Sequence, residues 1–323
     1  STLFPYTTLF RSSYLSMQDR NTIPYCVRGK TIVHSTRLMY NQISQKTQKG
    51  CEGMANNLKT TEEREQYVVK ANDLIRRTRY NLTAQQQKIV LYCISKIKPD
   101  DDINTQYEIN INDLAHVCGL QIDQSGTYYG TLKRDLQKLT TRQWCTMPNG
   151  TQMTISWIGD AMIIPLNSTV YIRFNPHMQT YLFDLKEKYT QYRLQNVLVL
   201  RGKYSIRLYE LLRSYTTQRN LDKNIEAEID LKVEDIRNLL DINGYNEWRE
   251  FNRRVIAPAV DEINRCSEEL HIDYYPTKGE HSRKIEQINF VITRAGATQE
   301  VRANKIRKKR FDHINPYGIN DVD

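Results

Sequence analysis

One order of predicted elements occurs twice along the chain, and this repetition constrains the fold more than any other feature of the sequence. Apolar residues recur at helical spacing in some segments and alternate with polar residues in others. The first copy comprises a helix that Asn81 or Thr83 caps and that extends to Lys98, a strand at 107–111, a short helix at 113–117, a helix at 126–140, and strands at 144–147, 151–158, 161–164 and 169–174. The turn at 148–150 joins the first two of these later strands into a hairpin.

The second copy has the same order of elements, without a close repeat of the residues themselves. Its elements are a helix at 205–216, a strand at 225–231, a short helix at 232–240, a long helix at 247–266, and a hairpin of strands at 270–275 and 285–293. This order is that of a winged helix-turn-helix, in which the second helix of the pair enters the DNA groove. The predicted fold is α+β with tandem winged helix-turn-helix domains at 67–190 and 191–294, divided near Thr190 after a helix at 176–188.

The two ends of the chain do not follow this pattern. Residues 1–66 start without Met and most of them show no sustained period, so we expect a non-native or disordered extension with the natural start near Met54. Residues 295–323 contain a run of basic residues without an acid, namely Arg302, Lys305, Arg307, Lys308, Lys309 and Arg310. We expect a flexible tail that either binds phosphates non-specifically or only keeps the chain soluble.

The distribution of charge limits where a nucleic acid can bind. The chain has 46 basic and 37 acidic residues and a net charge of +9, but the segment 54–293 accounts for only +1 of it. A nucleic-acid surface on the folded part must therefore be a local basic patch. No apolar run reaches the roughly 18 residues of a membrane span and no secretory signal is visible, so we expect a cytoplasmic protein without a membrane partner.

The helix at 247–266 has two chemically different faces. Its core-facing residues, three or four apart, are Trp248, Phe251, Val255, Ala259 and Ile263. The residues mostly on the other side are Arg249, Asn252, Arg253 and Arg254, near the N-terminal end, where recognition helices contact bases. Arginine fits guanine edges and asparagine fits adenine. An ordinary solvated helix can carry the same charges, and the preceding short helix and following hairpin favour DNA contact. Pro258 should kink or break the helix.

Three further groups of basic residues are candidate DNA contacts. They are Lys278, Arg283 and Lys284 at the hairpin tip, Lys133 and Arg134 on the outer face of the helix at 126–140, and Arg207 on the helix at 205–216. The hairpin tip fits either a wing that contacts phosphates or a solvated turn. The pair in the first domain leaves both a second DNA contact and a dimer surface open. Arg207 is expected to touch the DNA backbone.

The residues give no support for catalysis, a cofactor or a metal. The six cysteines form no CxxC pair, and the six histidines make no ligand spacing with them. The histidine pair that rolling-circle nickases use is missing, and the segment 29–31 lacks the earlier glycine of a phosphate-binding loop. We therefore predict a non-enzymatic binding protein.

Five stretches resemble the iteron-binding plasmid replication initiators of the RepA/RepE type. They are VVKANDLI (68–75), LTAQQQKIVLYCISKI (82–97), RGKYSIRLYELLRSY (201–215), FNRRVIAPAVDEINRCSEELHIDYYPTKG (251–279) and IEQINFVITR (285–294). The resemblance covers about 67–294, and the order and spacing of the stretches make it specific rather than any single motif.

This resemblance implies a function in the bacterial cytoplasm. Such initiators bind direct repeats at a plasmid origin as monomers, help to open adjacent AT-rich DNA, recruit host helicase machinery, and repress their own promoter as dimers. It also implies that the helix at 247–266 is the main base-reading helix, and that the first domain provides the dimer interface and a second DNA contact. The alternatives are a winged-helix transcriptional repressor without an origin function and, less favoured, a rolling-circle nickase.

Overall fold

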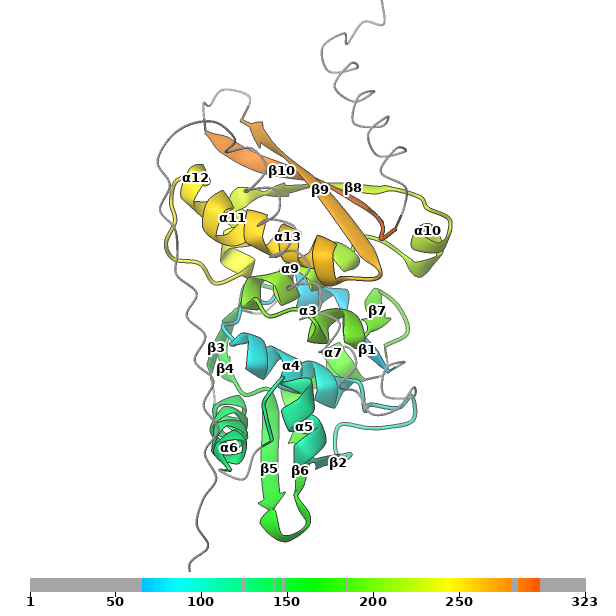
Figure 1. Ribbon diagram of the computed structural model, residues 1–323, viewed down its shortest axis with the longest axis vertical. Helices are drawn as coiled ribbons and strands as arrows, with labels where there is room; N and C mark the ends of the chain where they lie inside the picture. The colour runs from blue at the N-terminus through cyan, green and yellow to red at the C-terminus, as the bar shows by residue number, and fades with distance from the viewer. Residues whose placement is uncertain are drawn as a thin grey trace, which may run out of the picture. The chain divides into compact units, whose positions relative to one another are not determined.

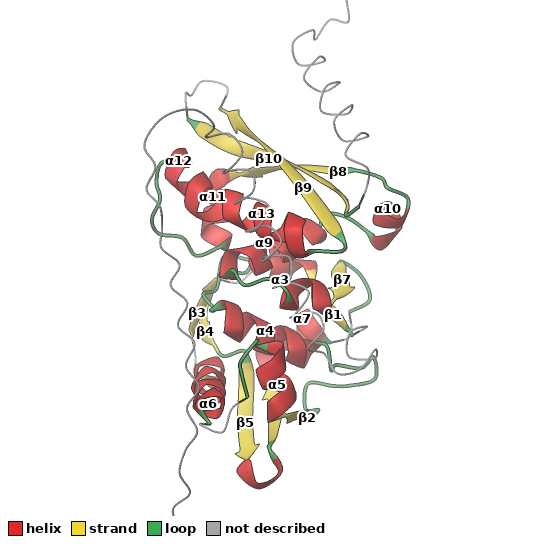
Figure 2. Ribbon diagram, in the orientation of Figure 1, coloured by secondary structure: helices red, strands yellow, loops and turns green. Residues whose placement is uncertain are grey.

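The structure, a computed structural model, describes residues 66–122, 126–141, 143–146, 149–183, 185–279 and 284–296. Two three-stranded antiparallel sheets each pack against their own set of helices (Figures 1 and 2). This is the predicted α+β architecture with two winged-helix modules. The predictions for the N-terminal extension and the basic tail concern residues outside the described part, apart from 66, 295 and 296.

The first module follows the predicted order closely. Its elements are α4 (Ala84–Ile94), β2 (Tyr107–Asn110), α5 (Ile111–Val117), α6 (Thr127–Thr140), β5 (Ile158–Ile164) and β6 (Thr169–Phe174). Thr83 and Gln86 form a capping box at the start of α4, in which each side chain accepts the backbone N–H of the other residue, at 3.2 and 3.1 Å. Strand β6 pairs with both β2 and β5, so the β5–β6 hairpin is the wing of this module.

Two small ribbons and several short helices complete the first half. They are β1 (Tyr67–Ala71) paired with β7 (Tyr189–Arg193), β3 (Gln143–Thr146) paired with β4 (Gln152–Ile155), α3 (Asn72–Arg76), η1 (Pro165–Asn167), η2 (Pro176–Met178), α7 (Gln179–Leu182) and α8 (Gln195–Leu198). The predicted helix at 176–188 is wrong beyond Leu182. The chain becomes extended at Phe183 and left-handed at Lys188 (φ 53°), because β7 pairs with β1 and buries Tyr192.

The second module repeats the order. Its elements are α9 (Lys203–Arg213), α10 (Gln218–Asp222), β8 (Ala227–Lys232), α11 (Val233–Leu239), α12 (Trp248–Phe251), η3 (Asn252–Ile256), α13 (Ala257–Cys266), β9 (Leu270–Lys278) and β10 (Ile285–Arg294). Strand β10 lies between β8 and β9, and its alternate residues Ile288, Phe290 and Ile292 are fully buried. Glu262 on α13 accepts hydrogen bonds from the backbone N–H groups of Arg201 and Gly202, at 2.7 and 3.1 Å, and thereby joins α13 to the two residues that precede α9.

The helix predicted at 247–266 is one helical segment with a widened turn. Helix α12 leads into η3, a π-helical turn, which continues into α13. Pro258 has no N–H to donate and its ring crowds the carbonyl of Arg254, so regular α-helical bonding is interrupted there. A π-helical turn accommodates this interruption. The interruption expected at Pro258 takes the form of a widened turn and not of a break, and this turn carries Asn252, Arg253 and Arg254.

A buried ionic cluster holds β1, β7 and α9 together. Lys70 Nζ donates to Glu210 Oε1 at 2.7 Å, and the hydroxyl of Tyr192 donates to the same oxygen at 2.5 Å. Arg207 Nη1 lies 3.7 Å from Glu210 Oε2, and all four residues are buried. Burial opposes the ionisation of Glu210, but the neighbouring cations and hydrogen bonds outweigh it, so the pKa of Glu210 is lowered. The cluster is therefore an ionised carboxylate enclosed by its donors.

The substitution Glu210→Gln should lower the free energy of unfolding by about 3–5 kcal/mol, because it leaves two cations buried without their counter-charge. Denaturant unfolding of the full chain at neutral pH measures this loss. The exposed Glu187 offers the matched control, since the same substitution there should change stability by less than about 0.5 kcal/mol. A loss at Glu210 as small as that of the control would contradict the assignment.

Lys88 on α4 is a second buried cation, and its environment makes stability depend on pH. Its Nζ donates to the carbonyl oxygen of Leu198 at 2.6 Å, and the residue is 3% exposed. Burial lowers the pKa of Lys88 from 10.5 to about 8. Between these two values the unfolded chain binds more protons than the folded chain, so the free energy of unfolding rises with pH.

The difference in unfolding free energy between the wild type and Lys88→Met should therefore rise by about 2 kcal/mol from pH 7 to pH 10, in favour of the wild type. The variant cancels the titration of all other groups, so the comparison isolates this lysine. Denaturant titrations at both pH values give the difference. A difference that does not change with pH would show that the lysine titrates normally in the folded chain.

Candidate nucleic-acid interface

The segment 248–266 buries one face and exposes the other, as predicted. The predicted core residues Phe251, Val255, Ala259 and Ile263 are each at most 2% exposed, Ile256 and Val260 are also buried, and Trp248 is partly buried against the same core. Arg249, Arg253 and Arg254 are exposed. The packing of the apolar face fixes the helix on its module and leaves these three cations available to a ligand.

Two of these cations share one carboxylate. Arg253 Nη2 lies 2.8 Å from Glu250 Oε2, and Arg254 Nε lies 3.1 Å from the same oxygen. Hydrogen bonds from the two arginines lower the pKa of Glu250, so the carboxylate stays charged. Among the described residues, Arg249 has no hydrogen-bond or ion-pair partner. The exposed face thus has one uncommitted cation and two that Glu250 orients, and DNA must compete with Glu250 for the latter.

Asn252 is less available than predicted. It is half-buried, and its Oδ1 accepts a hydrogen bond from the hydroxyl of Tyr274 on β9 at 2.8 Å. A bidentate contact with adenine uses both Oδ1 and Nδ2 of an asparagine. Such a contact would therefore require Tyr274 to release Oδ1, whereas a single donation from Nδ2 would not.

The hairpin tip of the second module is only partly within the described residues. Lys278 at the end of β9 and Lys284 just before β10 are both exposed, and the backbone N–H of Gly279 donates to the carbonyl oxygen of Lys284 at 3.3 Å. The third predicted contact of this wing, Arg283, lies outside the described residues. The hydrogen bond across the tip places the two lysines near one another at the end of the wing.

The first module presents a weaker basic surface. Lys133 and Arg134 on α6 are exposed, as predicted, whereas the neighbouring Asp135 is buried and accepts a hydrogen bond from Gln86 Nε2 at 2.9 Å.

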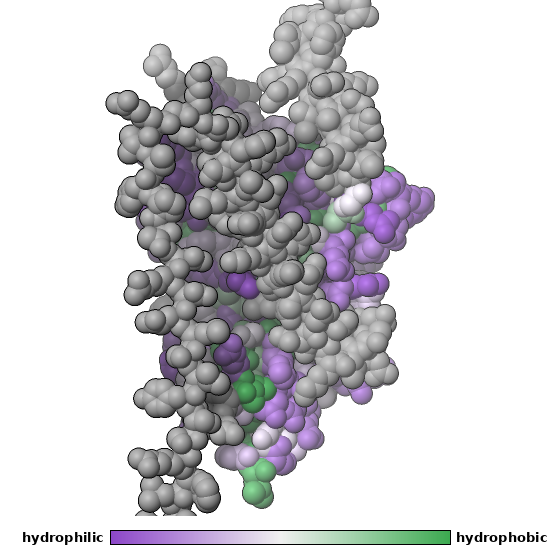
Figure 3. All heavy atoms as spheres, viewed as in Figure 1, coloured by the Kyte–Doolittle hydropathy of each residue, from purple (hydrophilic) through white to green (hydrophobic). Residues whose placement is uncertain are grey.

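The wing of the first module, the β5–β6 hairpin, carries no charged residue between 161 and 172, and Leu166 at its tip is 98% exposed. Hydrophobic atoms are visible at the end of this hairpin (Figure 3). The two wings therefore differ chemically, and only the second has lysines for phosphates.

The prediction that Arg207 touches the DNA backbone is wrong. Arg207 is 3% exposed, and Nη1 donates to the hydroxyl of Tyr80 at 2.6 Å while Nη2 donates to the carbonyl oxygens of Ile75 and Thr78 at 3.3 and 3.1 Å. Its guanidinium carbon also lies 4.1 Å from the centre of the Tyr80 ring. Arg207 is therefore a structural residue that binds the chain between α3 and α4.

Arg237, which no sequence pattern singles out, shapes the turn before the helical segment 248–266. Its Nη2 donates to the carbonyl oxygen of Gly244 at 2.6 Å and to Asn246 Oδ1 at 3.0 Å, and Nη1 donates to the carbonyl oxygen of Tyr245. Its guanidinium lies 5.6 Å from the centre of the Phe251 ring. No local pattern distinguishes this arginine from a solvated one, because its partners are created by the fold of the turn.

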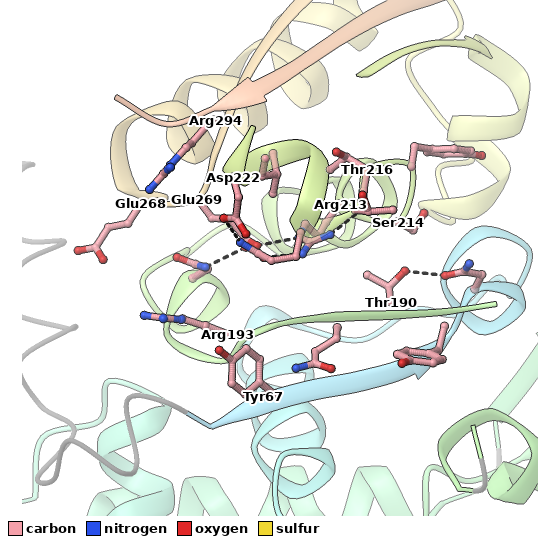
Figure 4. Close-up of a pocket in the computed structure, with 18 of the residues that line it drawn as sticks. Tyr67, Thr190, Arg193, Arg213, Ser214, Thr216, Asp222, Glu268, Glu269 and Arg294 are labelled. Atoms are coloured by element: carbon pink, nitrogen blue, oxygen red, sulfur yellow. Dashed lines mark hydrogen bonds and ion pairs between the residues drawn. The ribbon is translucent and has the colours of Figure 1, made fainter. Parts of the chain in front are cut away.

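A polar cleft of about 1050 Å3 lies beside β7, α9 and α10 (Figure 4). Arg213 crosses it, with Nε 2.8 Å from Glu269 Oε1 and Nη1 2.8 Å from the carbonyl oxygen of Thr216. Arg76, at the same cleft, lies 4.1 Å from the centre of the Tyr215 ring and donates to Ser214 Oγ at 2.9 Å. These arginines are engaged in joining elements, and the cleft carries no catalytic arrangement among the residues that line it.

Two features are absent from the described residues. No group of three or more histidine, cysteine, aspartate or glutamate side chains there could hold a metal ion. Within the same residues, every helix is too short or too polar to cross a membrane.

Comparisons with known proteins agree with this geometry. A family described as "Initiator Replication protein, WH1" matches residues 67–213, and one described as "Initiator Rep protein, WH2" matches residues 232–292. An Escherichia coli "Replication initiation protein" is 28% identical over 208 residues, which span 62% of this chain and 62% of the relative, less than two thirds of its length. A crystal structure of the Pi initiator protein in complex with iteron DNA covers 72% of this chain and 99% of the other, with a TM-score of 0.58 and 17% identity. That structure supports the fold.

Proposed function

The chain belongs to the initiator replication protein family, and from this membership we propose that it is a plasmid replication initiator that binds repeated origin DNA sequence-specifically. The observation that carries the proposal is the helical segment 248–266, which buries its apolar face and exposes Arg249, Arg253 and Arg254. In a winged helix this segment is the one that enters the major groove. Its arginines would contact guanine edges or phosphates there.

The other exposed cations would position the protein on the duplex. Lys278 and Lys284 at the second wing, together with Arg283, would contact phosphates beside the groove that the helix enters. Lys133 and Arg134 on α6 would make a second contact from the first module. Because the net charge of the body is small, binding depends on these local patches rather than on the field of the whole chain.

The remaining parts of the proposal follow from family membership. Binding of monomers to direct repeats would help to open adjacent DNA and recruit host helicase and initiator proteins. A homodimer, formed through the first module, would repress the promoter of its own gene and limit plasmid copy number. The protein would act in the bacterial cytoplasm, without enzymatic activity and without a cofactor. The division of the chain at 67–190 and 191–294, with a basic tail after it, belongs to the same proposal.

The full chain should bind the DNA that flanks its own gene about a thousandfold more tightly than scrambled DNA of equal length, at near-physiological salt. Gel-shift titrations measure this ratio, and repeated sites should give a ladder of shifted species. Equal binding to both DNAs with a steep dependence on salt would instead indicate a non-specific DNA-binding protein. Support for replication of an origin plasmid in a cell without other initiators separates an initiator from a repressor alone.

Arg253→Ala should weaken binding to the specific DNA by about 1–3 kcal/mol and leave binding to scrambled DNA nearly unchanged, because a bidentate contact with a base would be lost. Titration of both DNAs measures the two effects. Arg265→Ala is the matched control, since Arg265 is an exposed arginine at the other end of the same helical segment. An equal loss on both DNAs would make Arg253 a phosphate contact.

A further inference from the structure

Arg79 joins the first module to the turn that precedes the helical segment 248–266 of the second module. Arg79 Nε donates to Asp241 Oδ1 at 2.7 Å, and Arg79 Nη2 donates to Asn243 Oδ1 at 3.0 Å. Asp241 and Asn243 belong to the connection between α11 and α12, which spans residues 240–247. The two donors of one guanidinium thus bind two side chains of this turn, and a planar fork of this kind fixes direction as well as distance.

The first-module end of this contact is anchored by backbone. Arg79 forms an antiparallel bridge with Thr146, in which each N–H donates to the carbonyl oxygen of the other residue, at 3.2 and 3.3 Å. Thr146 is the last residue of β3, the strand that follows α6. The ring of the adjacent Tyr80 packs edge-on against that of Trp157, with 4.7 Å between the ring centres. The backbone N–H of Trp157 donates to the carbonyl oxygen of Leu139 on α6 at 3.1 Å. Arg79 is therefore held to the end of α6.

The second-module end of the contact is a turn with little conformational freedom. Asp241 and Tyr245 have left-handed backbone angles, φ 52° and φ 59°, which few residues other than glycine adopt readily. Arg237 bonds the carbonyl oxygens of Gly244 and Tyr245, and the guanidinium of Arg254 lies 5.6 Å from the centre of the Tyr245 ring. A displacement of Asp241 would consequently be passed to the start of the helical segment 248–266.

We propose that Arg79 is a positioning residue that sets the spacing and angle between α6 and the helical segment 248–266, and so the arrangement of DNA that both can contact at once. The proposal rests on the proposed function, because it assumes that both modules touch one duplex. The Arg79–Asp241 pair is partly exposed, with side chains 37% and 20% accessible. Such pairs contribute little to stability, so its removal should leave the chain folded and affect chiefly orientation.

The first test needs no DNA. Amide hydrogen exchange of the full chain should be at least about threefold faster within 241–247 in Arg79→Ala than in the wild type, with no change in α4 or α13. Arg77→Ala is the matched control, because Arg77 lies in the same segment and pairs with Asp73 at 3.7 Å, with both side chains more than half exposed. It removes the same charge and leaves the turn untouched. Exchange in 241–247 that is equal in both variants would overturn the proposal.

The second test measures DNA binding at two spacings. The probes are a repeat from the flanking DNA and the same duplex lengthened by about five base pairs, half a helical turn, between the segments that the two modules protect. Arg79→Ala should bind the native repeat about five- to tenfold more weakly than the wild type, because a loose linkage lowers the effective concentration of the second contact. When the duplex is lengthened, the affinity of Arg79→Ala should fall by a smaller factor than that of the wild type. The affinities of Arg79→Lys should lie between those of Arg79→Ala and the wild type.

The outcomes separate this proposal from the one on which it rests. Suppose that the wild type prefers the native repeat. The positioning role is then overturned if Arg79→Ala loses the same affinity on both duplexes, or loses none on either. A wild type without any preference for the repeat would overturn the proposed function and with it the assumption of one shared duplex. The exchange experiment still shows in that case whether Arg79 orders the turn.

Discussion

The carboxylate of Glu210 is the point on which the packing of β1 and β7 against α9 depends. A buried charge is costly unless it is paired and hydrogen-bonded, and here the pairing draws Lys70 from β1, Tyr192 from β7 and Arg207 from α9 to one site. Arg207 in turn bonds Tyr80 and the carbonyl oxygens of residues 75 and 78. Segments more than 100 residues apart in the sequence are thereby fixed beside α9, against which α13 packs. The helical segment 248–266, which includes α13, packs against these elements through α9.

The placement of the exposed basic side chains follows from a different constraint, the small net charge of the segment 54–293. A chain with nearly balanced charges can attract DNA only where cations are gathered and acids are kept away or engaged. On the helical segment 248–266 the acid Glu250 pairs with Arg253 and Arg254 and orients both of them. On α6 the acid Asp135 is turned into the core against Gln86, which leaves Lys133 and Arg134 outside. Each helix thus presents cations, by two different arrangements.

Periodicity predicted the elements well, because it reports local geometry. The spacing of Phe251, Val255 and Ile263 placed the buried face of the long helix, and Pro258 predicted its interruption. The predictions that failed depend on distant partners. The residues next to Arg207 in the sequence give no sign that it bonds the hydroxyl of Tyr80. The sequence pattern therefore did not distinguish this buried arginine from a solvated one. The helix predicted at 176–188 stops at Leu182 because β7 pairs with β1. Arg79 and Arg237 were missed for the same reason, since their partners lie in a turn that only the fold creates.

The central claim is that the helical segment 248–266 reads bases in the major groove. Interference by methylation of guanine N7 tests it directly, because that atom faces the major groove and is the acceptor an arginine would use. In the bound repeat, methylation of guanines within one short stretch of the site should block binding of the wild type. At one of those guanines, methylation should no longer matter to Arg253→Ala. Specific binding that tolerates methylation of every guanine in a repeat that contains guanines would contradict the account.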